Sequence, residues 1–323
     1  MTQIDVDVLI PVRNGARFLP ACLDSVFAQT LSARTVIVVD DGSTDATPRI
    51  LAEYAARRPN LQVIASEPCG ASHARNLALQ ASRAPFVAFL DSDDTWRPDK
   101  LAKQMALFAD DRPQVGFVHC AYFCIDEGGQ EIAPRRLIRP RKRGDVFTDL
   151  LKGEGLSGSA SAVVARRDLV MAAGGFDEKL FLGEDWDLWI RMAKLSHVDF
   201  VAEPLIAIRF HAGGTQHQQA VDRPEVFLLE RLRIVEKWID RVPDNGRILD
   251  RYRIEAARVA VKNALRFPPR WGLLRRLRAS DVPLARRLFR TRLAYAQSFV
   301  LALADAARCG LENARAGLRG LHP

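Results

Sequence analysis

The first ninety residues alternate between short apolar runs and segments with helical spacing, and this alternation constrains the fold more than any other feature. Four apolar runs are expected to be strands, at residues 6–10, 35–39, 61–65 and 86–90. Three intervening segments are expected to be helices, at residues 18–29, 48–56 and 73–82. Pro11 is expected to end the first strand. Buried strands separated by helices of this length are typical of a parallel sheet with helices on both faces. The sequence therefore predicts an α/β fold.

Three carboxylates, Asp91, Asp93 and Asp94, follow the fourth strand in the run Phe-Leu-Asp-Ser-Asp-Asp-Thr-Trp. Like charges at the end of a buried strand repel one another and lose water as they approach the core. A divalent cation resolves this conflict, and Mg²⁺ or Mn²⁺ is usually held by one or two carboxylates plus substrate phosphates. The alternative is structural: Asp94 or Thr95 caps a helix that begins near Pro98.

Polar residues also follow the other expected strands. Arg13 and Asn14 come after the first strand, residues 40–43 (Asp-Asp-Gly-Ser) after the second, and Arg75 stands in the helix that follows the third. Ligands of such sheets bind beyond the carboxyl ends of the strands, so we expect one site at this edge. No Gly-x-Gly-x-x-Gly follows the first strand and no Gly-x-x-x-x-Gly-Lys occurs, which argues against a dinucleotide or P-loop site.

Five motifs, in this order and spacing, resemble those of the family 2 glycosyltransferases. They are Ile-Pro-Val-Arg-Asn at 10–14, Val-Val-Asp-Asp-Gly-Ser-Thr-Asp at 38–45, Ala-Arg-Asn at 74–76, Leu-Asp-Ser-Asp-Asp at 90–94, and Gly-Gly-Phe-Asp at 174–177 followed by Gly-Glu-Asp-Trp-Asp-Leu-Trp at 183–189. The resemblance covers roughly residues 5–215. It implies a GT-A fold, a nucleotide-diphospho-sugar transferase sheet with flanking helices. It also implies inverting transfer of a sugar from a nucleoside-diphosphate sugar to a hydroxyl group.

On the donor side, the resemblance implies that the nucleotide-sugar binds across the first two strand ends. Pro11, Arg13 and Asn14 would then shape the base pocket. Asp41 would accept a hydrogen bond from a base N–H, as uracil requires, although a turn with a helix cap explains the same residues. Arg75 would meet the diphosphate or the base edge, and a helix N-terminus independently favours anions.

The acidic run has several implied roles in the same family. Asp91 would reach the ribose or serve as an alternative metal ligand, Ser92 would lie beside it against the nucleotide-sugar, Asp93 would bind the metal, and Asp94 would take either task. The cation bridges the two phosphates and neutralises the charge that grows on the departing diphosphate. His211 resembles part of a segment that follows the base in this family. It is either a third metal ligand, a contact to the diphosphate or a structural histidine.

Asp185 matches the catalytic base of the family. The acceptor hydroxyl must lose its proton as it attacks the anomeric carbon, and one positioned carboxylate can take it. Glu184 and Trp186 are then expected on the acceptor or sugar side, although packing is the default role for Trp186 and Trp189. The alternative makes Glu184 and Asp185 solvated acids in the first turn of a helix, stabilised by its dipole.

The net charge of +8 resides in the C-terminal part of the chain. From Arg251 onward there are 16 basic and 4 acidic residues, which leaves 31 basic and 35 acidic residues before it. We expect a catalytic domain at 1–223 and a basic helical extension at 224–323, with one helix over 284–303. The extension is either an interfacial anchor beside an anionic, lipid-linked acceptor or a helical cap or dimer element. No nucleic-acid recognition motif accompanies the charge.

Composition narrows the setting and leaves two other functions open. The N-terminus lacks a signal-peptide pattern, no run of about 18 apolar residues occurs, and the five cysteines are scattered. We therefore expect a cytoplasmic enzyme of surface glycan or polysaccharide synthesis, at the inner face of the membrane if the extension is an anchor. UDP is favoured as the nucleotide by the habit of the family. A non-catalytic sugar-nucleotide-binding or scaffold protein, or a nucleotidyltransferase that releases pyrophosphate, would use the same residues.

Overall fold

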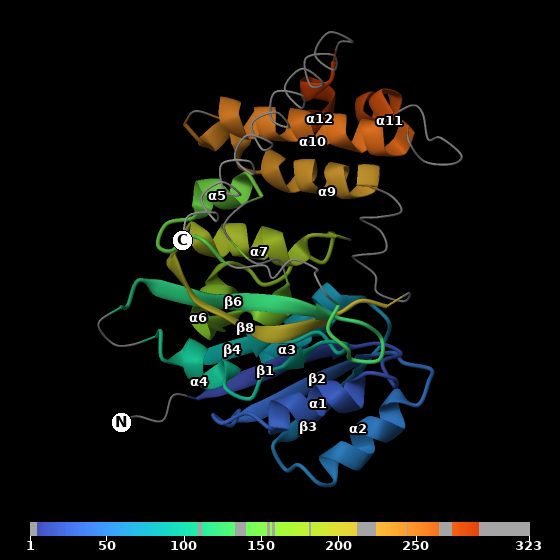
Figure 1. Ribbon diagram of the computed structural model, residues 1–323, viewed down its shortest axis with the longest axis vertical. Coiled ribbons are helices and arrows are strands. Elements are labelled where there is room, and N and C mark those ends of the chain that lie inside the picture. Colours follow the sequence, from blue (N-terminus) through green and yellow to red (C-terminus); the bar gives the residue numbers. More distant parts are fainter. Residues whose placement is uncertain are drawn as a thin grey trace, which may run out of the picture. The chain divides into compact units, whose positions relative to one another are not determined.

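The computed structural model describes residues 5–108, 112–132, 140–153, 156, 159–180, 182–211, 224–243, 245–264 and 273–290. The chain divides into two compact units, residues 1–214 and 215–323. The first unit has an α/β fold, and the described residues of the second unit form helices (Figure 1). The sequence predicts a domain boundary after residue 223, nine residues beyond the division after residue 214. Residues 212–223 lie outside the described part.

The first unit is built on an eight-stranded sheet with the strand order β3-β2-β1-β4-β7-β6-β8-β5, of which Figure 1 labels β1 to β4, β6 and β8. The strands are β1 Val6–Val12, β2 Thr35–Asp41, β3 Leu61–Ser66, β4 Phe86–Phe89, β5 Thr95–Trp96, β6 Val115–Ile125, β7 Val164–Arg166 and β8 His197–Arg209. The first four strands pair in parallel, as the sequence predicts. The other half of the sheet is mixed, because β7 and β5 run antiparallel to their neighbours while β6 and β8 are parallel.

Helices flank this sheet. They are α1 Leu19–Phe27, α2 Thr47–Ala55, α3 Ala71–Ala81, α4 Lys100–Met105, α5 Phe147–Leu151, α6 Arg167–Ala172 and α7 Glu184–Ala193, with a short 3₁₀ helix, η1, at Ala160–Ala162. The buried residues of α1 (Leu19, Cys22, Leu23 and Val26) recur at the spacing of one helix face. The three helices expected in the first ninety residues are therefore present within one or two residues of their predicted ends.

Strand β1 continues through Pro11, so the strand end predicted there is wrong. The pairing of β1 with β4 stops at Leu9 and Phe89, whereas its pairing with β2 continues through Pro11 and Val39. At Pro11 the strand therefore has a paired neighbour on one side only. A residue without an N–H group is tolerated at such a place in a sheet.

The segment after the acidic residues does not begin a helix at Pro98. Thr95 and Trp96 form β5, which pairs with β8, and α4 begins only at Lys100. Neither Asp94 nor Thr95 is therefore placed to cap a helix. The structural alternative that the sequence offered for these residues is wrong.

Asp7 is a buried carboxylate that joins three strands of the sheet. Its Oδ1 accepts the backbone N–H of Thr35 at 3.1 Å, at the start of β2. Its Oδ2 accepts the hydroxyl of Ser82 at 2.7 Å and the N–H groups of Arg83 and Ala84 at 2.9 Å each. Asp7 thereby fixes β1 to the start of β2 and to the segment that leads into β4.

Replacing Asp7 with Ala should lower the free energy of unfolding by about 3 kcal/mol or more, because several buried donors lose their acceptor. Urea unfolding of the whole chain measures this loss. Asp7→Asn should lose less, since its side-chain carbonyl can still accept some of these bonds. Equal losses in the two variants would show that the hydrogen bonds of Asp7 do not stabilise the sheet.

The described residues of the second unit form helices. They are α9 Pro224–Glu236, η2 Ile239–Arg241, α10 Gly246–Ala264, α11 Leu273–Ala279 and α12 Pro283–Leu288. Helix α12 ends at Leu288, and the part of the expected helix 284–303 that falls on residues 291–303 lies outside the described residues. Leu284, Ala285 and Leu288 of α12 and Phe289 after it are buried.

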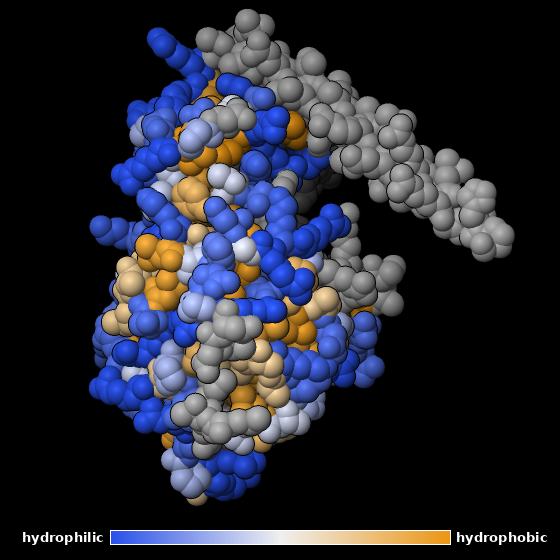
Figure 2. All heavy atoms as spheres, turned by 90° about the vertical axis from the view of Figure 1, so that its left-hand side faces the viewer, coloured by the Kyte–Doolittle hydropathy of each residue, from blue (hydrophilic) through white to orange (hydrophobic). Residues whose placement is uncertain are grey.

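The surface view in Figure 2 shows one face of the molecule, on which hydrophilic residues cover most of the described surface between smaller apolar patches. Large apolar side chains that are exposed among the described residues include Val63 and Leu195. Within the described ranges, no helix is both long enough and apolar enough to cross a bilayer.

Candidate active site

The ends of β1 and β2 are joined through Asn14. Its backbone N–H donates to Ser43 Oγ at 2.8 Å, and its Oδ1 accepts the backbone N–H of Thr44 at 2.8 Å. Asn14 adopts the left-handed conformation, with φ of 51°, which asparagine tolerates better than most residues. Pro11 is buried in β1 and Arg13 is exposed beside this connection. The first two motifs therefore form one wall at the carboxyl edge of the sheet.

Asp41, the last residue of β2, holds the loop that enters α3. Its Oδ1 accepts the backbone N–H of Cys69 at 2.8 Å, and its Oδ2 accepts that of Gly70 at 2.9 Å. Gly70 has φ of 98°, a conformation that favours glycine. Each carboxylate oxygen keeps a second lone pair, so Asp41 can still accept a base N–H. The sequence did not indicate its structural role, because the donors are backbone groups.

Arg75 is a buried arginine that joins two motifs. Its Nη2 donates to Asp91 Oδ1 at 2.6 Å and its Nη1 to Glu184 Oε1 at 3.1 Å. The guanidinium also lies over the ring of Phe176, 5.2 Å from its centroid. Burial alone lowers the pKa of Arg75, but the carboxylates of Asp91 and Glu184 raise it on balance. Arg75 is therefore a fixed cation between residues 91–94, the acidic turn, and α7.

Asp91 and Asp93 have different partners, although they stand two residues apart. Asp91 is paired with Arg75, and partial burial, opposed by Arg75 and assisted by Asp93, raises the pKa of Asp91. Asp93 Oδ2 lies 2.9 Å from His211 Nε2. Ser92 between them is half-buried. The acidic run is thus divided between the Arg75 side and the His211 side.

Asp94, the third acid of the run, is 3% exposed. Its Oδ2 accepts the hydroxyl of Ser161 at 2.6 Å, and its Oδ1 accepts the backbone N–H of Arg209 at 3.0 Å. Burial, followed by the charges of Asp93 and Asp91, raises the pKa of Asp94 well above its ordinary value. Arg209 begins the segment that contains His211, whereas Ser161 belongs to none of the five motifs.

Glu184 and Asp185 begin α7 and are buried, with exposed fractions of 5% and 9%. The alternative of solvated acids at these positions is therefore wrong. Asp185 Oδ1 accepts the backbone N–H of Trp186 at 2.6 Å. Burial, and next the charge of Glu184, raises the pKa of Asp185 to about 7, against the opposing charge of Arg75. A carboxylate of this pKa suits proton transfer near neutral pH.

The two tryptophans of α7 have packing roles. Trp189 is 2% exposed and contacts the rings of Phe89 and Phe117, with centroids 5.7 and 6.2 Å apart. Trp186 is half-buried, and its Nε1 donates to the carbonyl of Leu150 at 3.0 Å. Trp189 is therefore a core residue, and Trp186 holds α7 to α5.

His211 follows the end of β8 and is largely buried. Its side chain is 14% exposed, and its ring lies 4.8 Å from that of Phe18 in α1's N-cap position. The pair of Asp93 Oδ2 and His211 Nε2 offers one oxygen and one nitrogen ligand to a cation. No group of three or more such side chains occurs within the described residues. These two residues fit a divalent cation that takes its other ligands from phosphates and water.

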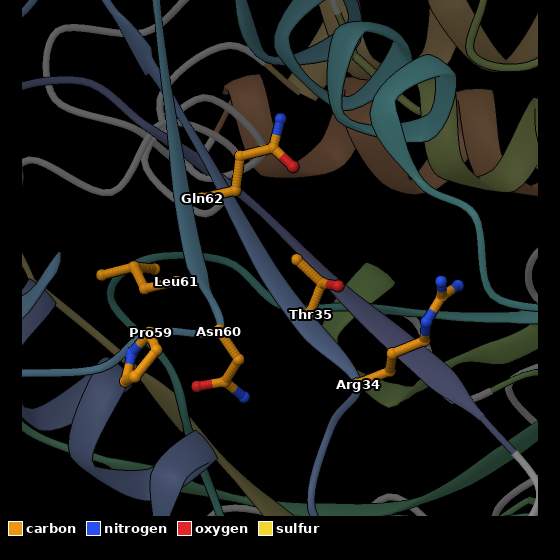
Figure 3. Close-up of a pocket in the computed structure, with 6 residues that line it drawn as sticks. All are labelled: Arg34, Thr35, Pro59, Asn60, Leu61 and Gln62. Atoms are coloured by element: carbon orange, nitrogen blue, oxygen red, sulfur yellow. The ribbon is translucent and has the colours of Figure 1, made fainter.

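A separate hollow of about 460 Å³ lies at the opposite edge of the sheet. It is lined by Arg34, Thr35, Pro59, Asn60, Leu61 and Gln62 (Figure 3). These residues lie at the beginnings of β2 and β3, which run parallel. The strand ends that carry the acidic residues therefore lie away from this hollow, which shares no residue with the candidate site.

Comparison with known proteins identifies the family. Residues 7–171, just over half of the 323 residues, match the family described as Glycosyl transferase family 2. The chain therefore belongs to glycosyl transferase family 2, which confirms the family and the class of protein predicted from its five motifs.

Two curated relatives illustrate the range of similar sequences. The uncharacterized glycosyltransferase RP339 of Rickettsia prowazekii (strain Madrid E) is 28% identical over 215 residues, which is 65% of each chain. The Escherichia coli UDP-Glc:alpha-D-GlcNAc-diphosphoundecaprenol beta-1,3-glucosyltransferase WfgD is 28% identical over 200 residues, 61% of this chain and 72% of its own. The chain thus spans just under two thirds of the length of the first of these relatives.

Solved structures show the same fold. S. aureus TarS 1–349 in complex with UDP-GlcNAc matches with a TM-score of 0.65 at 21% identity, covering 95% of this chain and 92% of that one. The mannosyltransferase PcManGT from Pyrobaculum calidifontis, in complex with GDP-Man and Mn²⁺, matches with a TM-score of 0.55 at 20% identity, covering 93% and 86%. At these identities the likeness concerns the fold alone, and it confirms the predicted GT-A fold.

Proposed function

We propose that the protein is a metal-dependent, inverting glycosyltransferase that moves a sugar from a nucleoside-diphosphate sugar to a hydroxyl acceptor. The observation that carries this proposal is the bridge made by Arg75. It joins Asp91 of the acidic turn to Glu184, the neighbour of Asp185. A group assigned to the donor, Asp91, is thereby connected through the buried Arg75 to the neighbour of the group assigned to proton transfer.

The donor would lie across the ends of β1 and β2. Pro11, Arg13 and Asn14 would then surround the base, with Asp41 accepting a base N–H, while Asp91 would reach the ribose. UDP is the proposed nucleotide because the TarS structure contains UDP-GlcNAc and the WfgD name specifies UDP-Glc. GDP should be tested beside UDP, because the PcManGT structure contains GDP-Man.

Asp185 would act as the general base. It would take the proton of the acceptor hydroxyl as that oxygen forms a bond to the anomeric carbon of the sugar. The bond from this carbon to the diphosphate oxygen breaks in the same step, and both of its electrons leave with the diphosphate. Direct attack from the opposite side inverts the configuration. Glu184 and Trp186, next to Asp185, would then border the acceptor or the sugar.

Asp93 and His211 would hold the divalent cation together with phosphate oxygens of the donor. When bound, the cation neutralises the charge that develops on the leaving diphosphate. An imidazole beside a carboxylate suits Mn²⁺ better than Mg²⁺, which prefers oxygen ligands. The PcManGT structure, which contains Mn²⁺, supports this choice.

The acceptor is proposed to be a glycan or a lipid-linked glycan in surface polysaccharide synthesis, a class supported by the acceptor in the WfgD name. Cytoplasmic residence at the membrane surface is part of the same proposal. Leu284, Ala285 and Leu288 of α12 are buried, whereas Arg286 and Arg290 are exposed. Contact between this unit and an anionic bilayer would therefore be electrostatic, without insertion of α12.

Saturating UDP and Mn²⁺ together should raise the melting temperature of the protein more than either one alone, because ligands that bind only the folded state stabilise it. In Asp93→Asn, the rise in melting temperature caused by Mn²⁺ should be mostly lost, whereas the rise caused by UDP should remain. Thermal unfolding with UDP, GDP and each metal measures both rises. Asp99→Asn, which changes a partly exposed acid that pairs with Lys103 outside the site, is the matched control.

The product of the reaction separates the proposal from its rivals. Incubation of a UDP-sugar and Mn²⁺ with an acceptor should release UDP. Release of pyrophosphate from a sugar phosphate and a nucleoside triphosphate would identify a nucleotidyltransferase instead. Binding of UDP without turnover on any acceptor tried, including lipid-linked saccharides, would contradict the assignment of an enzyme.

A further inference from the structure

Asp94 differs from the other two acids of the turn because protein donors already engage both of its oxygens. The Ser161 hydroxyl donates to Oδ2 and the Arg209 backbone N–H donates to Oδ1. The residue is 3% exposed, whereas the side chain of Asp93 is 33% exposed. A carboxylate held in this way is poorly placed to bind a cation. The hydrogen bonds of Asp94 therefore indicate a role other than metal binding.

Ser161 holds the acidic turn from inside the protein. Its fully buried hydroxyl donates to Asp94 and also accepts the backbone N–H of Asp91 at 3.0 Å, so one oxygen contacts both ends of the turn. The carbonyl of Ser161 accepts the indole N–H of Trp96 at 3.1 Å. The inner side of the turn is thereby fixed to β5 and η1.

Arg209, the last residue of β8, holds the turn from the other side. Its Nε donates to the carbonyl of Asp93 at 2.9 Å. Its Nη1 donates to the carbonyls of Asp126 and Glu127 at 3.0 and 3.3 Å, in the turn after β6. The end of β8 is therefore connected to the acidic turn by one backbone and one side-chain hydrogen bond.

We propose that Asp94 and Arg209 are positioning residues that hold His211 beside Asp93, and that Asp94 is not itself a metal ligand. His211 stands two residues after Arg209, so fixing the end of β8 against the turn sets where its ring can lie. Both Arg209 and His211 contact the ring of Phe18, each at 4.8 Å. This inference rests on the proposed function, which assigns the cation to Asp93 and His211.

Two substitutions of Asp94 separate positioning from metal binding. Asn in place of Asp94 keeps an oxygen for the Arg209 N–H, and its amide can donate to Ser161 Oγ. Ala removes both contacts. With UDP present, Mn²⁺ binding measured by electron paramagnetic resonance should weaken by less than about 3-fold in Asp94→Asn and by about 10-fold or more in Asp94→Ala, the usual range for groups behind metal ligands.

Asp93→Asn is the matched control, since it removes the charge of the proposed ligand itself. Its loss of Mn²⁺ affinity should exceed that of Asp94→Asn by about 10-fold or more. Arg209→Lys keeps a positive charge but loses the fork that reaches three carbonyls, so it should resemble Asp94→Ala. Equal losses in Asp93→Asn and Asp94→Asn would show that Asp94 binds the metal and would overturn the assignment.

A double-mutant cycle tests whether Asp94 acts through His211. In the His211→Ala background, Asp94→Ala should reduce Mn²⁺ affinity by less than about 3-fold further, because the residue that it positions is already absent. Independent, additive losses would contradict a positioning role. If Asp94→Ala does not fold, Arg209→Lys replaces it in the same cycle.

Hydrogen exchange provides a readout that needs no metal. The Arg209 amide should exchange slowly in the wild type and in Asp94→Asn, and much faster in Asp94→Ala, with or without Mn²⁺. Unchanged exchange in Asp94→Ala would overturn the inference. A wild type that binds UDP but no Mn²⁺ would instead refute the metal in the proposed function, and amide exchange would still decide whether Asp94 holds β8.

Discussion

Replacing Asp185 with Asn should reduce sugar transfer by about 100- to 10,000-fold, the range typical of losing a general base. Asn has nearly the same shape and can still accept the backbone N–H of Trp186, which Asp185 accepts at 2.6 Å. It cannot take a proton from the acceptor hydroxyl. Initial rates of UDP release measure the loss, and calorimetry with UDP should show unchanged donor binding.

The neighbouring acid gives the control for this substitution. Glu184→Gln keeps an oxygen that can accept from Arg75 Nη1, and it leaves the carboxylate of Asp185 in place. It should therefore retain far more activity than Asp185→Asn. If Asp185→Asn kept more than about a tenth of the wild-type rate, the proton acceptor would have to be another group.

The pH profile carries the same prediction in a second form. Because burial and Glu184 raise the pKa of Asp185 to about 7, the base holds its proton below this pH and loses it above. The value of kcat/KM, which reports ionisations of the free enzyme, should therefore rise through about pH 7 and level off. Glu184→Gln removes a charge that raises this pKa, so its midpoint should move to lower pH.

The parts of the fold that follow from local patterns could be predicted from the sequence. The apolar runs at 35–39 and 61–65 predicted β2 and β3, and the spacing of apolar residues predicted α1. The sequence wrongly predicts that β1 ends at Pro11, because it does not show that the pairing of β1 with β4 stops before this residue. Pro11 therefore needs no partner on the β4 side and can remain in the strand. Strand ends in a sheet depend on neighbours that are distant in the chain.

The candidate site was predicted unevenly for a related reason. Motifs identified Asp91, Asp93 and Asp185, but no pattern indicates that Arg75 pairs with a residue 109 positions away. The partners of Asp41 and Asp94 include backbone N–H groups, which every residue except proline carries, so residue types give no signal. Only the folded chain shows which of the acids are held by the protein and which are open to a ligand.

Replacing Arg75 with Met should destabilise the protein by about 3–5 kcal/mol, since removing one partner of a buried ion pair leaves uncompensated charge. The side chains of Arg75 and Glu184 are 5% and 7% exposed, and that of Asp91 is 31% exposed. Arg75→Lys should show an intermediate loss, because an ammonium group does not reproduce the two-sided fork of the guanidinium. Urea unfolding measures both losses, and UDP titration should show weaker donor binding in each variant.

The triple variant Arg75→Met, Asp91→Asn, Glu184→Gln tests whether uncompensated charge causes the loss of stability in Arg75→Met. Neutralising both carboxylates should restore much of the lost stability, whereas transfer activity should stay low because Asp91 no longer offers a carboxylate to the donor. Acidification should act in the same direction: burial raises the pKa of Asp91, and as this carboxylate takes up a proton the stability difference between wild type and Arg75→Met should shrink. A deficit that is unchanged at low pH and in the triple variant would mean that Arg75 stabilises the site by packing on Phe176, not by bridging the two acids.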